Sequence, residues 1–434
     1  MIKKLIFLIL IISLTGACSF DTKSGLWTAN EDFEKETVTN KKIKVLFQDE
    51  KIIEKEFNKN FQIKTPLRKT INYNSQNTNN ENIFTIKNDI KKISKFNFSK
   101  IKYFDFFEPN LTFDEGSLFF FDKKGTIIKF DNSSNLIWKK NYYDKKEKKL
   151  LPILNFASNK NTLLVSDSLS NYYALDIKTG KLRWKENHNS LFISDIKIDD
   201  EYFFVIDMNN IINCFSLKNG KLIWTFNTDN VLIKSQKKLS IVIDNRNIYF
   251  NNSNGDIYSL NKKNGNLNWL IPTNYKKTQP FLLKYSNLVL NDNNIYFSNN
   301  ESNFFSIDKN NGFVVWEQKI NSDLRPIIVD ELIFTISSEG YFYVIEKVSG
   351  NIIRVTDVFE NFSQRKRKKI SPIGFILTDK NAYLSVSNGR ILEIDIATGK
   401  HLASIKIDKG KISKPFINNG EIFVIKDNSI IKLN

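Results

Sequence analysis

The chain has 434 residues, of which 41% are hydrophobic and 26% are charged, and its formal net charge is +17. A chain of this length can bury a large core, and two cysteines are too few for a disulfide scaffold, so stability must come from packing. The positive charge could point to nucleic acid. Lysine is instead spread through expected turns and strand ends beside abundant asparagine and isoleucine, so we expect no nucleic-acid partner.

The first residues have the pattern of a secretory signal peptide. Two lysines precede an apolar run from Leu5 to Ile12, well short of the roughly 20 residues that a membrane-spanning helix needs. The run leads into LTGAC, and small residues directly before a cysteine resemble the bacterial lipobox. We therefore expect residues 1–17 to be a lipoprotein signal peptide and Cys18 to carry the lipid, including palmitate. Ordinary cleavage near Ala17, with an unmodified cysteine, is the alternative.

Residues 18–92 are predicted to form a lipidated polar tether, largely disordered. Acyl chains contribute about 0.8 kcal/mol per buried methylene, so several chains would hold the protein firmly at a membrane. The segment has no repeat, and its run NSQNTNN at 74–80 cannot bury enough apolar surface to fold alone. The apolar segment 43–47 could dock on a partner, add a strand, or pack on the side of the domain that follows.

A motif with a period in the forties recurs through the rest of the chain. Its clearest copies are YYALDIKTGKLRW at 172–184 and NCFSLKNGKLIW at 213–224, and two more surround Gly265 and Gly312. A period of this length is typical of β-propeller blades. The less regular copies are two that keep Gly350 and Gly399 without the tryptophan, an early one that ends at Trp138, and an incomplete eighth that runs from Pro415 to Leu433.

Each repeat is expected to form a four-stranded antiparallel blade. Short apolar segments such as 248–250 and 257–260 alternate with turns rich in glycine and asparagine, which readily adopt the positive φ that tight hairpins require. In five copies a tryptophan closes the outer strand, where its ring can pack against the neighbouring blade. These structural tryptophans are Trp138, Trp184, Trp224, Trp269 and Trp316.

The sequence therefore predicts an all-β fold, an eight-bladed β-propeller over residues 93–434. The eighth copy lacks its outer strand, and a propeller must close so that no sheet edge stays open between the first and last blades. We expect an N-terminal strand within Ser94–Phe107 to complete it.

The repeat, a small residue followed by Leu-Asp, Thr-Gly and tryptophan, resembles the PQQ-like repeat of the quinoprotein superfamily. The lipobox, the eight copies and the closing half-blade resemble, within it, the BamB family of outer-membrane assembly lipoproteins. That resemblance implies a non-catalytic scaffold, a monomer within a larger complex, that binds a BamA-like subunit and assists insertion of β-barrel proteins. Unfolded outer-membrane proteins are further candidate partners. Ser19, after the lipidated cysteine, favours the outer membrane, with the protein facing the periplasm.

The resemblance also implies a partner contact in the loop after the third blade, where the family has apolar residues before an arginine. The matching residues are Val231 and Ile233 as apolar anchors and Lys234 as the cation. Alternatively, Val231 and Ile233 simply begin the next inner strand. An acidic pair that some members carry after the fourth blade is replaced by Tyr275-Lys276-Lys277.

A quinoprotein that uses pyrroloquinoline quinone, or another periplasmic ligand-binding propeller, is the alternative function. Such enzymes resemble this chain in the repeat but are longer, hold adjacent cysteines near the cofactor and set calcium between carboxylates and an asparagine. This chain has no adjacent cysteines, and Cys214 occupies the repeat position of Ala174 and Ser259, which indicates a small core residue. An enzyme would also need carboxylates and an arginine that converge on the propeller axis.

The remaining polar residues favour structural roles. His188 and His401 have no metal-ligand spacing. Acids recur four residues before the turn glycine in three blades, as Asp176, Asp308 and Asp395, where they can accept bonds from turn amides. We therefore expect no catalytic, cofactor-binding or metal-binding residues and no cofactor. The basic run at 365–369 is interpreted as a solvated loop, with anionic lipid or an acidic partner as the alternative.

Overall fold

The computed structural model describes residues 92–114, 116–228, 237–273, 284–291, 293–299 and 301–433, together with Ile63 and three short strands nearer the N-terminus. The chain divides into two units, Met1–Ile53 and Glu54–Asn434. In the first unit β1 (Cys18–Phe20) pairs antiparallel with β2 (Trp27–Ala29). The predicted signal peptide, the segment 43–47 and the polar run at 74–80 lie outside the described residues.

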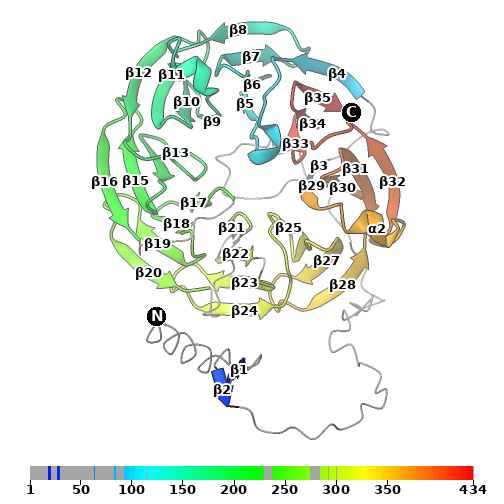
Figure 1. Cartoon of the computed structure of the whole chain (residues 1–434). Coiled ribbons are helices and arrows are strands. Elements are labelled where there is room, and N and C mark those ends of the chain that lie inside the picture. Colours follow the sequence, from blue (N-terminus) through cyan, green and yellow to red (C-terminus); the bar gives the residue numbers. More distant parts are fainter. Residues whose placement is uncertain are drawn as a thin grey trace, which may run out of the picture. The chain divides into compact units, whose positions relative to one another are not determined.

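The second unit is an eight-bladed β-propeller, as predicted (Figure 1). Each blade is an antiparallel meander whose first strand is innermost and whose fourth strand is outermost. Blades 1 to 4 comprise β5 (Thr112–Asp114), β6 (Ser117–Phe121), β7 (Ile127–Asp131), β8 (Leu136–Lys140); β9 (Leu154–Ser158), β10 (Thr162–Asp167), β11 (Asn171–Asp176), β12 (Leu182–Asn187); β13 (Lys197–Asp199), β14 (Tyr202–Ile206), β15 (Ile211–Ser216), β16 (Leu222–Asn227); and β17 (Ile241–Ile243), β18 (Asn247–Asn251), β19 (Ile257–Asn261), β20 (Leu267–Ile271).

The second half of the ring repeats the arrangement, with one extra strand in blade 7 and a composite blade 8. Blades 5 to 8 comprise β21 (Val289–Asn291), β22 (Asn294–Asn299), β23 (Asn303–Asp308), β24 (Val314–Gln318); β25 (Ile327–Val329), β26 (Leu332–Ile336), β27 (Tyr341–Glu346), β28 (Ile352–Asp357); β29 (Pro372–Thr378), β30 (Asn381–Val386), β31 (Arg390–Asp395), β32 (His401–Lys406); and β33 (Phe416–Asn418), β34 (Glu421–Lys426), β35 (Ser429–Leu433) with β4 (Lys92–Asn97).

The core lies between neighbouring blades, because each sheet buries both of its faces. All six residues of β10 are buried, whereas the outermost strand of the same blade, β12, has no buried residue. Apolar side chains on both faces of the middle strands therefore pack against the blades on either side.

The outer-strand tryptophans link each blade to the next. The indole Nε1 of Trp184 in blade 2 donates a hydrogen bond of 3.1 Å to the carbonyl of Leu217 in blade 3. A Cβ at Gly220, whose φ is +72°, would lie 2.6 Å from the Trp184 ring, so only glycine lets the turn approach the indole. The same packing joins Trp224 to Gly265, Trp269 to Gly312 and Trp316 to Gly350.

The ring closes through an N-terminal strand, as predicted, but the strand starts two residues before the range Ser94–Phe107 proposed for it and ends well before Phe107. β4 covers Lys92–Asn97 and pairs antiparallel with β35. Phe96 is fully buried and contacts Phe130 of blade 1 and Phe423 of blade 8, which ties the two ends of the ring together. The rest of the predicted range is a loop that contains the 3-10 helix η1 (Phe104–Phe106).

Two described segments of the predicted tether also contact the propeller. β3 (Ile83–Phe84) pairs in parallel with Leu377 and Thr378 of β29, on the inner side of blade 7. Ile63 is buried in the cluster of blades 6 and 7. Among the described residues there is no helix of the length and apolarity needed to cross a membrane.

Candidate functional site

Strands alternate in direction within a blade, so the segments that join blades share one side of the ring with the turns between second and third strands. We call this side the loop face. It carries the longest connections of the propeller, which are 98–111, 141–153, 188–196, 228–240, 272–288, 319–326, 358–371 and 407–415. Loops on a rigid scaffold are the usual place for binding residues, so the loop face is where a site is expected.

A cavity of about 450 Å³ opens at the centre of the loop face. Its lining comes from the residues that directly precede or begin the innermost strands, which converge on the propeller axis. We call this cavity, with the two smaller recesses that adjoin it, the axial funnel. Its charged lining residues are Asp105, Glu108, Asp195, Lys237, Lys238, Lys284, Asp323, Arg325, Lys411 and Lys414.

Ion pairs connect the funnel residues of different blades. Lys414 Nζ lies 3.5 Å from Glu108 Oε1, which joins the approaches to blades 8 and 1. Lys237 Nζ lies 3.3 Å from Asp323 Oδ2, which joins the approaches to blades 4 and 6, past the start of blade 5. Residues far apart in sequence thus meet only because the ring is closed.

The electrostatic character of the funnel is visible in two pKa values. Partial burial would raise the pKa of Glu108, but the charges of Lys414, Lys237 and Lys238 outweigh it and lower that pKa to about 2. Burial of Lys197, the first residue of β13, lowers its pKa to about 8; Asp195 opposes this shift, and like charges nearby reinforce it. The funnel lysines therefore stabilise the ionised form of Glu108, whereas burial disfavours the charged form of Lys197.

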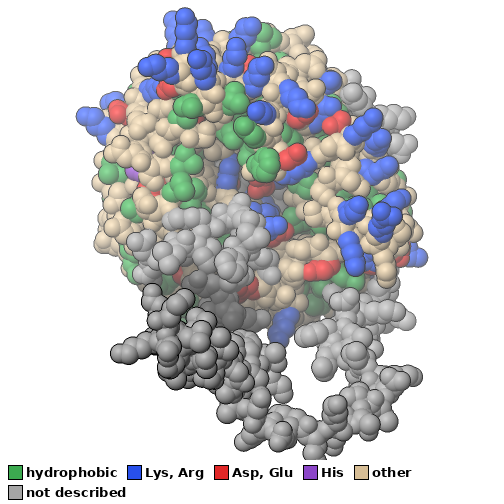
Figure 2. Space-filling view, in the orientation of Figure 1, with side chains coloured by type: hydrophobic (Ala, Val, Ile, Leu, Met, Phe, Trp, Pro, Cys, Tyr) green, Lys and Arg blue, Asp and Glu red, His purple; other side chains and the backbone are tan. Residues whose placement is uncertain are grey.

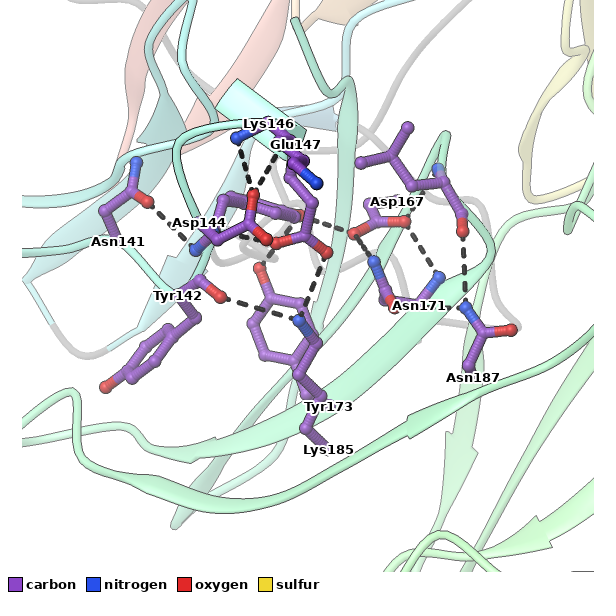
Figure 3. Close-up of polar contacts among 12 residues, drawn as sticks. Asn141, Tyr142, Asp144, Lys146, Glu147, Asp167, Asn171, Tyr173, Lys185 and Asn187 are labelled. Carbon is purple, nitrogen blue, oxygen red and sulfur yellow. Dashed lines mark hydrogen bonds and ion pairs between the residues drawn. The ribbon is translucent and has the colours of Figure 1, made fainter. Parts of the chain in front are cut away.

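A second polar cluster lies between blades 1 and 2 (Figure 3). The Tyr143 hydroxyl donates to Asp167 Oδ2 at 2.6 Å and lies 3.3 Å from the Tyr173 hydroxyl. Asp167 also accepts the backbone N–H groups of Leu169 and Asn171 at 2.8 and 2.9 Å. Burial raises the pKa of both tyrosines, which keeps them protonated and donating. The cluster is a satisfied turn network that fixes the connection 141–153, not a reactive centre.

The cations of the surface are dispersed. In Figure 2 lysine and arginine side chains are spread around the rim of the face in view. The basic run at 365–369 begins in the short helix α2 (Gln364–Arg367). There, Arg367 Nη1 lies 2.6 Å from Asp357 Oδ2, so one charge of the run is used to hold the loop.

Comparison with known families shows which family this chain belongs to. A family model described as outer membrane protein assembly factor BamB matches residues 123–356, more than half of the chain. The protein belongs to this BamB family. The matched region extends from blade 1 to the end of blade 6. No curated protein matches the sequence.

Solved structures share the fold. BamB from Moraxella catarrhalis has 13% identity and a TM-score of 0.64, with 80% of this chain and 100% of that chain covered. A europium-containing methanol dehydrogenase has 11% identity and a TM-score of 0.62, with 81% and 88% covered. The C-terminal WD40 domain of Sif2 has 13% identity and a TM-score of 0.60, with 79% and 97% covered. At these identities the likeness concerns the propeller alone.

The contact residues suggested by the BamB resemblance, Val231, Ile233 and Lys234, lie outside the described residues. The described residues on either side are Thr228, whose hydroxyl donates to the Asn210 carbonyl at 2.8 Å, and Lys237, which lines the axial funnel. The connection that contains the predicted contact therefore starts beside a turn of blade 3 and ends at the funnel.

The other predicted positions have local roles. Cys18 is the first residue of β1. Cys214 is buried opposite Trp224 across β15 and β16, and burial raises the pKa of its thiol to about 12. Asp176 Oδ1 accepts the Thr179 amide at 2.9 Å within its turn. Within their turns, Asp308 Oδ1 accepts the Asn310 amide at 2.7 Å and Asp395 Oδ1 accepts the Thr398 amide at 2.6 Å.

The axis holds one feature that a cofactor enzyme would need, because Arg325 and carboxylates do converge there. The other features do not fit the quinone and its calcium. In the described part of the chain no three His, Cys, Asp or Glu side chains are grouped so that they could hold a metal ion. The five tryptophans of the repeats lie on outer strands, away from the funnel, so none of them could pack against a group bound there. The funnel carboxylates face lysines instead.

Proposed function

We propose that this protein is a non-catalytic scaffold lipoprotein of the outer-membrane β-barrel assembly machinery. Its task is to bind a BamA-like subunit and to assist the folding and insertion of β-barrel proteins. Membership of the BamB family is the observation that carries this proposal. The closed propeller supports it, because a rigid ring presents eight connections on one face to a partner.

The proposed contact is the connection after blade 3, with Val231 and Ile233 as apolar anchors and Lys234 as the cation. A described neighbour supports an apolar surface at this place. Met208 lies in the blade 3 turn that Thr228 contacts through Asn210, and 40% of its surface is exposed. Methionine adapts its shape readily to a partner, and apolar anchors beside one cation form an effective small interface.

The proposed location is the periplasmic face of the outer membrane, with lipidated Cys18 as the anchor and residues 18–92 as the link to the propeller. The BamB family supports this arrangement. The BamA-like subunit and unfolded outer-membrane proteins are the proposed partners, and this chain acts as a monomer within that assembly.

Affinity capture tests the proposal. The tagged, lipidated protein is isolated from gently solubilised envelopes, and bound proteins are identified by mass spectrometry. The wild type should recover a BamA-like barrel subunit, and the double variant Val231→Asp, Ile233→Asp should recover much less of it. The matched control is Leu222→Asp, Ile223→Asp, which places the same charges in the same blade on exposed residues next to the opposite face.

The outcomes separate the role from the contact. If the wild type recovers no barrel subunit although the bait is folded, the assembly role is wrong. If both double variants lose the subunit equally, the role stands but the contact does not lie at Val231 and Ile233. Circular dichroism of all three proteins establishes that the substitutions leave the propeller intact.

A further inference from the structure

We propose that the axial funnel is a binding site for a small organic anion in which a carboxylate is attached to an apolar body. This proposal concerns a small-molecule ligand and not the assembly partner. It uses residues at the centre of the loop face and does not depend on the scaffold role.

The size and walls of the funnel fit such a ligand. Its volume of about 450 Å³ lies within the range of about 300 to 1,000 Å³ that is usual for small-molecule sites. Phe106, Phe107 and Ile373, which keep exposed surface, supply the apolar wall, and Lys284, Lys411 and Lys414 supply the cations. An apolar pocket with a few convergent charges both buries a hydrophobic body and orients an ionised group.

The charges of the funnel favour an anion. Cations outnumber carboxylates among its described lining residues, and buried Lys197 lies close enough to Arg325 and Lys414 for their charges to lower its pKa. The Lys411 ammonium donates a hydrogen bond of 2.9 Å to the backbone carbonyl of Asp105. Because that carbonyl is neutral, this bond does not neutralise the charge of Lys411. Arg325 adds a guanidinium, whose planar donors match a carboxylate.

One carboxylate already occupies this environment. Glu108 is paired with Lys414, and its side chain keeps about a third of its surface exposed, 33%. The lowered pKa of Glu108 shows that the lysines stabilise an ionised carboxylate at this place. Burial is the main cause of the lowered pKa of Lys197, and the charges of Arg325 and Lys414 lower that pKa further against the opposing charge of Asp195. A ligand carboxylate would reduce the repulsion of Lys197 by Arg325 and Lys414.

The experiment measures the affinity of 2-naphthoate and of its neutral analogue 2-naphthamide for the full mature protein by isothermal titration calorimetry. The two probes share an apolar body and differ in charge. We expect 2-naphthoate to bind with a Kd below about 1 mM and 2-naphthamide to bind at least about tenfold more weakly.

Two variants are expected to change the affinity for 2-naphthoate in opposite directions, and a control variant is expected to leave it unchanged. Glu108→Gln removes the resident carboxylate and should tighten 2-naphthoate binding about threefold or more, whereas Lys414→Met should weaken it about fivefold or more. Lys218→Met removes a charge from an exposed turn remote from the funnel and should leave the affinity unchanged. Because Glu108→Gln predicts a gain, the test holds even if Lys414→Met does not fold.

Equal affinity for the acid and the amide would overturn the proposal, because no charge recognition would then exist. An affinity that falls as much in Lys218→Met as in Lys414→Met would also overturn it, since only the net charge of the protein would be acting. No change, or a loss of affinity, in Glu108→Gln would place the anion elsewhere. Capture of the barrel subunit is read separately and is unaffected by these results.

Discussion

Docking of the outer-strand tryptophan on a turn glycine can be tested by comparing two glycines that share a backbone conformation. Gly220 and Gly420 have φ values of +72° and +80°. A Cβ on Gly220 would overlap the Trp184 ring at 2.6 Å, whereas a Cβ on Gly420 would meet nothing within 4 Å. Gly220→Ala therefore adds backbone strain and steric overlap with the Trp184 ring, whereas Gly420→Ala adds only backbone strain.

The expected magnitudes follow from these two contributions. An alanine in the left-handed region costs about 1 to 2 kcal/mol, which is the full expected effect of Gly420→Ala. Overlap with a packed ring costs about 1 to 3 kcal/mol more. Gly220→Ala should thus lower the free energy of unfolding by about 2 to 5 kcal/mol.

The assay is urea unfolding followed by far-ultraviolet circular dichroism, whose signal does not depend on tryptophan fluorescence. In a Trp184→Ala background the overlap disappears, so Gly220→Ala should then cost no more than Gly420→Ala does. The double-mutant cycle should give a coupling of about 1 to 3 kcal/mol between Gly220 and Trp184. Equal costs for the two glycine variants in the wild-type background would refute the docking argument.

Three further predictions concern ring closure and the axial charges. Phe96→Ala should cost about 3 to 5 kcal/mol because it leaves a cavity between blades 8 and 1, whereas exposed Lys95→Ala on the same strand should change stability by less than about 0.5 kcal/mol; urea midpoints compare the two. The Lys197 pKa is lowered to about 8, so the unfolded chain binds its proton more tightly, and stability should rise between pH 8 and 10 in the wild type more than in Lys197→Met. The Glu108 pKa is lowered to about 2, so its stabilisation is present at neutral pH and lost as pH falls from about 4.5 toward 2. The loss between pH 5 and 3 should be smaller in Glu108→Gln, and an equal acid sensitivity in both proteins would contradict the assignment.

The blades were predictable because their signals are local. The turn glycine, the tryptophan and the apolar strands recur within each repeat, and each has a direct backbone or packing reason. The closing strand was predictable in kind, because the last repeat is incomplete, but its extent was not. The aromatic run around Phe104 looks like a strand, yet Phe104 is buried within a 3-10 helix. Periodicity alone cannot separate these cases in a short apolar segment.

The axial funnel was not predictable from local patterns. Glu108, Lys237 and Lys414 each follow a different blade and are separated by more than one repeat, so no spacing motif connects them. In the sequence each is a single charge before an apolar strand, which resembles a solvated loop residue. Only a superposition of all the repeats would have shown that charges recur at the start of the inner strands, where ring closure brings them together.

The position of these charges has an energetic consequence. Buried ion clusters are often no more stabilising than apolar residues of similar volume, because desolvation offsets the attraction between the charges. The lowered pKa of Lys197 reflects that cost, because burial is its main cause and a group that gained from its surroundings as a cation would have a raised pKa. Lys197→Met should therefore stabilise the propeller at neutral pH while weakening the binding of 2-naphthoate. A propeller needs no such charges to close, as the apolar contacts of Phe96 show, so their presence at the axis is better explained by binding than by stability.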